Sequence, residues 1–474
     1  MLSLMHTETA YNQALDYLYS FVDYSLKKSS ELAKADFNLD RMRVLLAALG
    51  SPEQKYPSLH VAGTKGKGST CALMASALTA AGYKTGLYTS PHLQDYVERI
   101  QIDGRPVSHV QLVELVEQVK PAVAKIPKLT TFEITTALGF LYFAQQNVEA
   151  AVIEVGLGGR LDATNVVTPR VSVITSLSYD HMAVLGNTLT LIAGEKAGII
   201  KPGIPVVSSP QNDEARVVLE RVAKERHAPL TLVGRDVLFA AGEHSLDGQT
   251  LSVSGKQKAG GRKQKAEGKK QEAEGRRQEA EGRKQEAENN QESVILRVPL
   301  LGQHQVVNAA TAYAALKASG LKVRDQAIRK GFAGVTWPCR FEIVSREPPV
   351  VIDSAHNADS ARRLRQALDD YFPGWPVIWI FAILEDKDAA GMLTELAPRL
   401  TRVIATQADH PRAFEVEKIV VLVQQAGIPV EAVKSSSAAL ARALELASDH
   451  AIVLSAGSVA FAGEVKTAWQ KLNL

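Results

Sequence analysis

Short apolar runs rich in valine and isoleucine recur along the chain, separated by longer stretches with helical spacing. They lie at 59–62, 151–155, 171–175 and 206–208, and again at 350–352, 377–383, 403–405 and 452–454. Continuous apolar runs of this length that alternate with helices are typical of parallel sheets. Open α/β sheets bind their ligands at the carboxyl ends of their strands. We therefore predict an α/β protein with its functional residues at the strand ends.

A change in composition interrupts this pattern between 255 and 293. QKAEG, QEAEG, QEAEG and QEAEN recur at a seven-residue interval from Gln264. A coiled coil needs two apolar positions per heptad and this repeat offers only alanine, so we expect exposed helix or disorder that is dispensable for chemistry. The flanking LSVSG and SVILRV predict two strands of a hairpin, with the repeat as its loop.

The length of the chain predicts more than one domain. At 474 residues it exceeds the roughly 250–300 residues at which a single core stops growing. We place the junction at Thr336-Trp337-Pro338-Cys339-Arg340, which follows a helical stretch and precedes the second series of strands. The predicted domains are 1–336, with the repeat as an insertion, and a smaller one at 337–474.

Charge and cysteine content exclude several function classes. The net charge is only +3, and much of the basic excess lies within the repeat, so nucleic acid is not an expected partner. Cys71 and Cys339 lie far apart and show no disulfide or zinc spacing, which fits a reducing compartment. The start of the chain lacks a signal-peptide core, and no run approaches the ~18 apolar residues of a membrane span. We expect a cytoplasmic protein that does not contact membranes.

The strongest local motif is HVAGTKGKGST, which lies between a predicted strand and a predicted helix. Backbone N–H groups at such a turn, together with the helix dipole, form a site for anions, and Lys67 can reach the terminal phosphates. Its spacing departs from the usual G-x-x-x-x-G-K-[ST], and a glycine-rich turn without a ligand is the alternative. The candidate nucleotide-binding residues are Gly63, Thr64, Lys65, Gly66, Lys67, Gly68, Ser69 and Thr70.

Three further segments carry polar residues suited to a metal site. Glu154 ends a strand before a glycine loop, and Mg²⁺ prefers carboxylate, hydroxyl and water oxygens. Asp180-His181 follows the next strand, and Glu195-Lys196 closes a helix. Taken singly, each has an ordinary explanation, since a lone histidine is usually satisfied within the fold and a Glu-Lys pair is usually a solvated helix face.

The order of the motifs resembles that of a known family. HVAGTKGKGST, TSPHL, TFEITTA, EVGLGGRLDATN, GNTL, EKAGIIKPG, LGQHQVVNAATA, WPCR, DSAHN and DKD occur as in folylpolyglutamate and dihydrofolate synthases, within the Mur-type amide ligases. The resemblance implies an N-terminal P-loop-type ATPase domain with a parallel-rich sheet, and a smaller C-terminal Rossmann-like α/β domain. The single-chain architecture makes a monomer the expected oligomeric state.

The chemistry implied by the resemblance is amide formation. The γ-phosphoryl group of ATP passes to a carboxylate of folate or dihydropteroate, and the amine of L-glutamate attacks the acyl phosphate. A carboxylate is a poor electrophile, so phosphorylation supplies a leaving group while two Mg²⁺ ions and lysine neutralise charge. The alternatives are a Mur-type ligase for peptidoglycan precursors, which usually has a further N-terminal domain, and a nucleotide-controlled binding module.

The resemblance also carries roles over to individual positions. It implies Lys67, Lys196, His181, Arg340 and His356 as catalytic residues, Asn308, Arg340 and Asp353 as further nucleotide contacts, and Ser90, Glu154, His181 and a carbamylated Lys196 as metal ligands. The pterin would lie near Thr131, Phe132, Glu133, Leu161, Asp162 and Ala163. For Phe132 a core position at helical spacing remains an alternative to stacking on the pterin.

Three positions depart from the usual family pattern. Lys65 replaces the asparagine common in bacterial relatives, Ala358 stands where proline is expected, and Cys339 stands where glycine is frequent. Lys65 adds a positive charge beside the phosphates, which is compatible with anion binding.

Overall fold

The computed structural model describes residues 2–23, 37–255, 293–447 and 451–472. The low-complexity repeat lies outside these residues except at its ends, so its expected helix or disorder stays a prediction. Among the described residues, no helix is long and apolar enough to cross a membrane.

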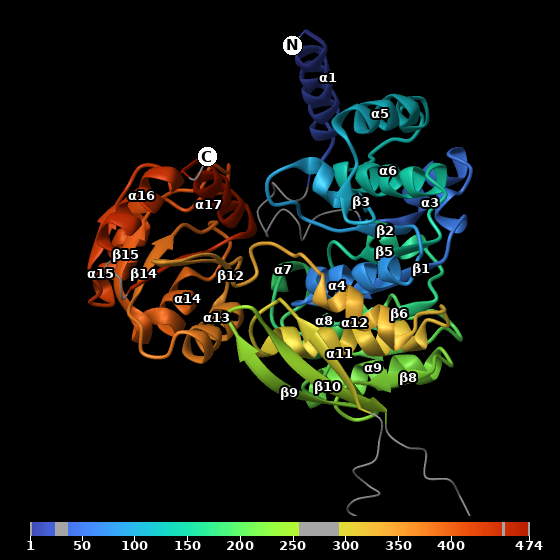
Figure 1. Cartoon of the computed structure of the whole chain (residues 1–474). Helices are drawn as coiled ribbons and strands as arrows, with labels where there is room; N and C mark the ends of the chain where they lie inside the picture. Colours follow the sequence, from blue (N-terminus) through green and yellow to red (C-terminus); the bar gives the residue numbers. More distant parts are fainter. Residues whose placement is uncertain (1, 24–36, 256–292, 448–450, 473–474) are drawn as a thin grey trace, which may run out of the picture.

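An eight-stranded sheet forms the centre of the first part of the chain (Figure 1). Its order is β4-β3-β2-β5-β1-β6-β7-β8, and only β3 and β4 run antiparallel to their neighbours. The strands are β1 (Ser58–Ala62), β2 (Thr85–Tyr88), β3 (Ile100–Ile102), β4 (Arg105–Pro106), β5 (Ala150–Glu154), β6 (Val171–Ile174), β7 (Val206–Ser208) and β8 (Leu230–Leu232). The parallel strands predicted from the apolar runs are confirmed, within one residue at their ends.

Helices cover both faces of this sheet. Side chains of β1 alternate between the two faces, with Leu59 and Val61 in one core and Ala62 in another. The first face carries α4 (Lys67–Ala80), α11 (Gln303–Ala318) and α12 (Asp325–Ala333). The other carries α1 (Leu2–Tyr19), α3 (Leu39–Ala48), α5 (His109–Val123), α6 (Thr131–Gln145), α8 (Leu189–Ala197) and α9 (Asp213–Glu225). Burial on both faces explains why the strands are continuously apolar.

The register of the central strands determines where the site forms. In the β1–β5 pair Val61 lies opposite Glu154, and in the β1–β6 pair Ala62 lies opposite Ile174. The loop that leaves β1 therefore starts beside the carboxyl ends of both neighbours. This places the glycine-rich motif next to Glu154, as the strand-end argument predicts.

A second, three-stranded antiparallel sheet packs against α11 and α12. It consists of β9 (Val237–Ser245), β10 (Gly248–Gly255) and β11 (Val294–Val298), in the order β11-β10-β9. The β10–β11 register pairs Val253 with Val294, which confirms the predicted hairpin around the repeat. The sequence pattern did not predict β9, whose side chains are mostly exposed.

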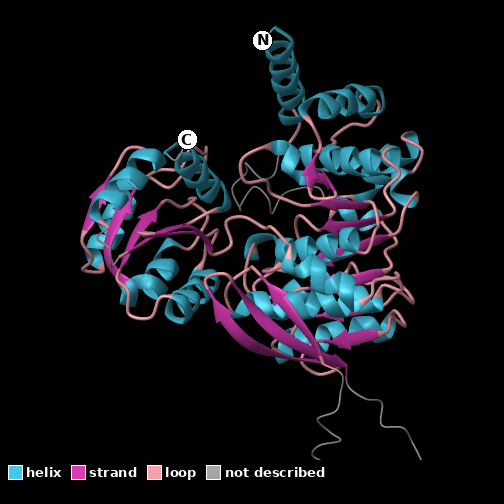
Figure 2. Cartoon of the chain, viewed as in Figure 1, coloured by secondary structure: helices cyan, strands magenta, loops and turns pink. Residues whose placement is uncertain are grey.

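The last part of the chain forms a six-stranded sheet in the order β12-β13-β17-β14-β15-β16, with only β12 antiparallel. Helices cover both of its faces (Figure 2). The strands are β12 (Glu342–Arg346), β13 (Pro349–Ile352), β14 (Val377–Phe381), β15 (Leu400–Ala405), β16 (Val430–Ala432) and β17 (Ile452–Ala456). The helices are α13 (Ala358–Tyr371), α14 (Ala389–Leu396), α15 (Val416–Gln425), α16 (Ser436–Leu446) and α17 (Val459–Leu472).

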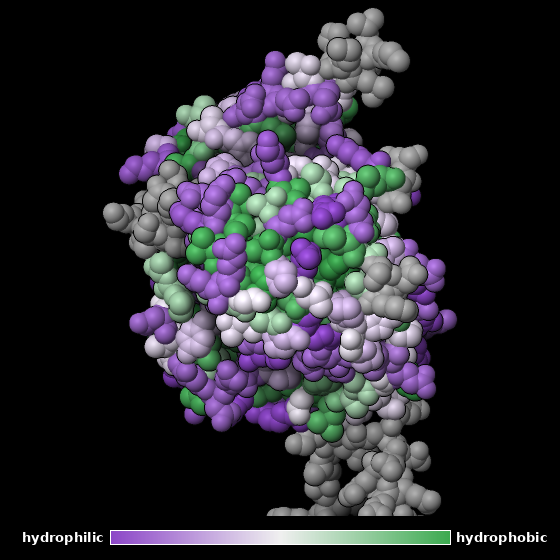
Figure 3. Space-filling view, turned by 90° about the vertical axis from the view of Figure 1, so that its left-hand side faces the viewer, coloured by the Kyte–Doolittle hydropathy of each residue, from purple (hydrophilic) through white to green (hydrophobic). Residues whose placement is uncertain are grey.

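This C-terminal sheet and its helices form the left-hand part of Figure 1. The view onto that side shows an apolar area within a mostly polar surface (Figure 3). Val421 of α15 is about half exposed. The α/β fold class, with one parallel-rich sheet in the N-terminal part and another in the C-terminal part, is confirmed. The expected boundary at 336/337 falls between α12 and β12, and as a domain limit it stays a proposal.

Candidate nucleotide and catalytic site

The glycine-rich loop connects the end of β1 to the start of α4, which begins at Lys67. The backbone N–H groups of Thr64 and Lys65 both donate to Ser176 O at 3.0 Å, which fixes the loop against the segment after β6. Gly66 has φ +87°, and a Cβ there would lie 2.2 Å from Asn308 Oδ1. Only glycine fits this position. The loop thus opens at the positive end of a 14-residue helix, a favourable place for phosphates.

Glu154 lies beside this loop, at the end of β5. Its Oε1 is 4.0 Å from Lys67 Nζ, and its Oε2 accepts a hydrogen bond from the Ser90 N–H at 3.3 Å. Burial raises the pKa of Glu154 to about 7, although the positive charges of Lys67 and Arg340 act in the opposite direction. A buried carboxylate beside Lys67, the lysine predicted to reach the phosphates, is suited to hold a cation there.

Lys196, in the last turn of α8, is buried against the same loop. Its Nζ donates to Gly63 O at 2.9 Å. Burial, and next the positive charge of Lys67, lower the pKa of Lys196 to about 7. Gly159 allows this approach, because a Cβ there would lie 2.8 Å from Glu195 O and 3.0 Å from Lys196 Cα. An appreciable share of Lys196 is therefore a neutral, nucleophilic amine at neutral pH.

Asp180 and His181 follow β6 and lie on the side of the loop that faces the C-terminal sheet. Lys65 Nζ donates to Asp180 Oδ2 at 3.1 Å and to His356 Nε2 at 3.0 Å. His181 adopts a left-handed backbone conformation, with φ +50°. Burial is the main cause that lowers the pKa of His181 and of His356 to about 4, so both imidazoles are neutral at pH 7 and able to accept or coordinate.

Arg340 lies in the segment that joins α12 to β12. Its neighbours Cys339 and Phe341 both have left-handed backbones, with φ +56° and +48°. The Arg340 guanidinium donates to Cys339 O at 2.9 Å and to Ser354 Oγ at 2.6 Å. Left-handed backbones on both sides of one arginine indicate that the fold constrains its direction.

Asp353 and Asn308 have partners within the protein. Asp353 Oδ2 accepts from the Phe341 N–H and Oδ1 from the Ala355 N–H, each at 2.7 Å, so this carboxylate braces the segment around Arg340. Asn308 Nδ2 donates to Gln305 Oε1 at 2.9 Å, which leaves Asn308 Oδ1 directed at Gly66.

The residues predicted to contact a pterin lie around α6 and the loop after β5. Glu133 accepts from the Thr130 N–H at 2.8 Å and from Arg41 Nε at 3.2 Å, and Thr131 Oγ1 donates to Leu18 O at 2.9 Å. These two side chains therefore have structural partners. Their neighbour Phe132 packs closely on the loop, because a Cβ on Gly156 would lie 2.5 Å from its ring.

Asp162 is buried and also organises this loop. It accepts from the Leu157 N–H at 2.8 Å and from the Thr164 N–H at 3.0 Å. Ala163 is buried beside it and Leu161 is partly exposed. Phe132 lies at the margin of the core formed by α1, α3, α5 and α6, so a packing role and contact with a ligand are compatible. Substrate binding by this group stays a prediction.

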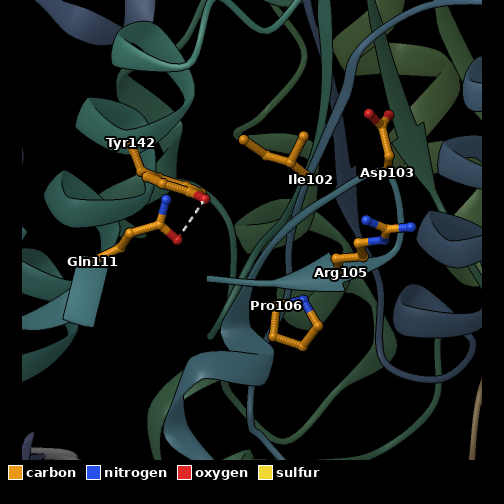
Figure 4. Close-up of a pocket in the computed structure, with 6 residues that line it drawn as sticks. All are labelled: Ile102, Asp103, Arg105, Pro106, Gln111 and Tyr142. Carbon is orange, nitrogen blue, oxygen red and sulfur yellow. Dashed lines mark hydrogen bonds between the residues drawn. The ribbon is translucent and has the colours of Figure 1, made fainter. Parts of the chain in front are cut away.

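A surface cavity of about 550 Å³ lies elsewhere, at the β4 edge of the large sheet. Its lining residues are Ile102, Asp103, Arg105, Pro106, Gln111 and Tyr142, and Tyr142 donates to Gln111 across it (Figure 4). Three strands separate β4 from β1. This cavity contains none of the predicted site residues.

The predicted metal ligands supply a mixed set of donor groups. Within the described parts of the chain, no group of three or more His, Cys, Asp or Glu side chains is placed to hold a metal ion. Glu154 and His181 supply one carboxylate and one imidazole, and Ser90 adds a hydroxyl. A hard ion such as Mg²⁺ fits this set once phosphate oxygens or a carbamate on Lys196 supply further oxygens.

Two further polar residues were not among the predicted site residues. Asp180 holds Lys65, and its position next to His181 in the sequence was the available signal. Gln305 holds Asn308 from one helical turn before it, a spacing that could have indicated the pair.

The fold and the site define a Mur-type ligase. The sequence matches the Mur ligase middle domain over residues 61–236 and the Mur ligase, glutamate ligase domain over residues 339–459. The protein is thus an ATP-dependent ligase of this class, in agreement with its phosphate loop.

Similarity to individual proteins defines the family more closely. The chain is 36% identical over 416 residues to the dihydrofolate synthase/folylpolyglutamate synthase of Bacillus subtilis, covering 85% of this chain and 87% of that protein. It is 37% identical over 409 residues to the folylpolyglutamate synthase of Lacticaseibacillus casei, covering 84% of each. The chain belongs to the dihydrofolate synthase/folylpolyglutamate synthase family.

Solved structures agree with this assignment. Mycobacterium tuberculosis folylpolyglutamate synthase complexed with ADP superposes with a TM-score of 0.82 at 32% identity, covering 97% of this chain and 98% of that chain. Escherichia coli FolC in complex with DHPP and ADP gives a TM-score of 0.78 at 30% identity, covering 96% and 100%. The expected family is confirmed, and the alternative of a nucleotide-controlled binding module is not favoured.

Proposed function

We propose that this enzyme joins L-glutamate to a folate, to dihydropteroate, or to both, through an acyl phosphate formed with ATP. The names of its relatives support both activities. The observation that carries the proposal is the convergence of Lys67, Glu154 and Lys196 on the glycine-rich loop, with Lys196 Nζ 2.9 Å from Gly63 O. A phosphate site with a buried carboxylate and a buried amine has the parts that phosphoryl transfer to a carboxylate needs.

The nucleotide phosphates would lie on the backbone of residues 63–70, with Lys67 on the terminal phosphate. Asn308, Arg340 and Asp353 surround the start of α4 and the segment before β12, where they would hold the rest of the nucleotide or the backbone next to it. Mg²⁺ ions held by Ser90, Glu154, His181 and Lys196 would neutralise charge on the transferred phosphoryl group. Lys67 and Arg340 would add positive charge from the protein itself.

Lys196 would act in the site as a carbamate. Its neutral Nζ attacks the carbon of CO₂, the new N–C bond forms, and one proton leaves the nitrogen to water. The product has a negative charge and two oxygens where an ammonium group would repel cations. The lowered pKa of Lys196, caused first by burial, supports this modification because the attacking form is the free amine.

The carboxylate substrate would enter from the side of Phe132 and Asp162. Phe132 would stack on the pterin, while the loop that Asp162 organises would shape the pocket. Arg340 and His356 both follow α12 in the sequence. They would lie above the phosphates and help exclude water from the acyl phosphate. A monomer in the cytoplasm, with domains at 1–336 and 337–474, completes the proposal.

To test this proposal, the purified protein is incubated with ATP, Mg²⁺ and L-glutamate, together with either dihydropteroate or tetrahydrofolate. We expect a glutamate-sized mass gain in at least one substrate, with ADP released in equal amount. Arg340→Ala should abolish most turnover, whereas Arg226→Ala, an exposed arginine after α9, should not. ADP release without a mass gain in either substrate would contradict the folate assignment and direct attention to peptidoglycan precursors.

Intact-protein mass spectrometry tests the modification separately. We expect a gain of one CO₂ on wild-type protein measured under bicarbonate without acid, and no gain in Lys196→Arg. An unmodified lysine in fully active enzyme would contradict the carbamate.

A further inference from the structure

Trp337, in the middle of the segment that joins α12 to β12, lies on the glycine-rich loop. A Cβ on Gly68 would lie 2.8 Å from Trp337 Cζ2 and 3.1 Å from its Nε1. The indole ring is partly buried and packs against the core that α4, α11 and α12 share. Gly68 is the second residue of α4, so the ring covers the first turn of the helix where the phosphate loop ends.

The indole nitrogen of Trp337 is buried and has no hydrogen-bond partner among the described residues. An indole N–H can only donate, and when buried it usually finds an acceptor. Leaving such a donor unpaired is unfavourable relative to its hydration in the unfolded chain. By contrast, the indole of Trp379 donates to Ala456 O at 3.2 Å, so a buried tryptophan elsewhere in this chain is satisfied by the protein.

The surroundings of this donor favour an anionic or strongly polar acceptor. The first turn of α4 presents backbone N–H groups and the positive end of the helix dipole. Lys67 precedes Gly68, and Asn308 Oδ1 approaches the loop at Gly66. Trp337 and Asn308 thus contact neighbouring glycines of the same loop, which is the predicted binding place of the nucleotide.

We propose that Trp337 positions the nucleotide by donating a hydrogen bond from its indole N–H to an oxygen of the bound nucleotide. The proposal rests on the nucleotide site of the proposed function and adds a residue to it. Nucleotide binding satisfies a donor that the described part of the chain leaves unpaired. Removal of the N–H therefore weakens nucleotide binding without weakening the protein itself, which is the opposite of what a packing role would give.

The test compares the full-length wild-type protein with Trp337→Phe, which keeps an aromatic ring and removes the N–H. ADP affinity is measured by titration calorimetry, and the melting temperature is measured without nucleotide. We expect the Kd for ADP to rise about tenfold, the size of one hydrogen bond to a charged acceptor. The melting temperature should stay unchanged or rise. Trp375→Phe, at the margin of the C-terminal core, is the matched control and should leave the Kd for ADP unchanged.

Tryptophan fluorescence gives a second measurement that does not depend on the folding of Trp337→Phe. ADP should change the emission of wild-type protein and of Trp375→Phe. Absence of any change in either protein would overturn the proposal, because the indole would then not meet the nucleotide.

Two calorimetric results would also overturn it. If wild type binds ADP and Trp337→Phe binds it equally well, the indole donates nothing to the nucleotide. If Trp337→Phe instead lowers the melting temperature without nucleotide and leaves the Kd unchanged, the residue serves packing alone. Failure of the wild-type protein itself to bind ADP is a different result, since it would remove the proposed nucleotide site together with this inference.

Discussion

Lys65 Nζ, in the phosphate loop, lies 3.0 Å from Nε2 of His356, which comes from the segment after β13. His356 Nδ1 lies 2.9 Å from Ser354 O, so Nδ1 carries the hydrogen and Nε2 accepts from the lysine. The same ammonium donates to Asp180 Oδ2 at 3.1 Å. A single side chain thus joins the glycine-rich loop to the segment that follows β13 of the C-terminal sheet.

Replacement of this lysine tests its role as a link. Lys65→Asn shortens the side chain so that it can no longer reach both Asp180 and His356. We expect the melting temperature to fall by a few degrees, because largely buried hydrogen bonds to charged groups contribute about 1.5–3 kcal/mol each. Lys125→Asn changes an exposed lysine and should leave the melting temperature unaltered. Equal melting temperatures for the two variants would contradict the link.

Lys196 gives a prediction about turnover. In Lys196→Ala the bond to Gly63 O and the proposed carbamate are both lost. We expect kcat to fall on the order of 100-fold, since loss of groups that hold a metal or its ligands costs activity on this scale. Added formate or acetate should restore part of the rate by supplying carboxylate oxygens.

A nearby lysine provides the control for this experiment. Lys201 donates to Asn165 O at 2.8 Å and lies beyond the end of α8. Lys201→Ala should keep kcat within about threefold of wild type, and carboxylates should not stimulate it. Stimulation of both variants alike would show that the rescue is not specific to position 196.

Acid should destabilise the protein through its buried histidines. His60 is fully buried, its Nε2 lies 2.9 Å from Thr164 Oγ1, and burial lowers its pKa to about 3. The unfolded chain takes up this proton near pH 6.5, whereas the folded protein does so only near pH 3. Stability is therefore full above pH 6.5 and decreases as the pH falls below it, by up to about 1.4 kcal/mol per pH unit for this one group.

Urea unfolding at pH 7.5, 6.0 and 5.0 measures the effect. His60→Gln keeps a side-chain donor and does not titrate in this range, so its loss of stability between pH 7.5 and 5.0 should be smaller than that of wild type. Some dependence remains, because burial lowers the pKa of His92 and His304 as well. An equal loss of stability with falling pH in wild type and His60→Gln would show that His60 does not contribute to the pH dependence.

Replacement by alanine should weaken nucleotide binding at one glycine and increase stability at another. Gly68→Ala places a Cβ 2.8 Å from the rigid ring of Trp337, so either the loop or the ring must shift, and we expect ADP binding at least about tenfold weaker. Gly194, inside α8, would meet nothing within 4 Å. Gly194→Ala should raise the free energy of unfolding by about 0.5–1 kcal/mol. Calorimetry and urea unfolding of both variants check the pair.

The hairpin offers a deletion test. Replacing residues 255–292 with Asn-Gly would join β10 and β11 by a two-residue turn in the register that pairs Val253 with Val294. We expect turnover within about twofold of wild type, because the predicted site residues all lie outside this segment. Leu251→Ala, at a buried position of β10, should in contrast cost about 2–5 kcal/mol of stability. Loss of turnover in the deletion variant would show that the repeat serves the chemistry.

Local pattern was sufficient for the glycine-rich loop and for most of the parallel strands, because these depend on residues close in sequence, but it did not predict the short buried strand β2. It also did not predict β9, which is mostly exposed, or β16, an edge strand of three residues. Exposed strands need no continuous apolar run, so they leave no such signal in the sequence. The contact of Lys65 with His356 spans 291 positions, and that of Gly68 with Trp337 spans almost as many. Contacts of this kind arise from packing between distant segments, and no spacing rule predicts them.

The β10–β11 register also bears on how this sequence can evolve. The chain leaves the sheet at Gly255 and returns before Val294, at adjacent ends of two paired strands. Closure entropy grows only with the logarithm of the number of residues between them, so each added or lost heptad changes stability by on the order of 0.1 kcal/mol. Replication slippage could thus lengthen or shorten the repeat with almost no selection against it through folding, and related lineages should differ in repeat number while the two strands keep their sequence.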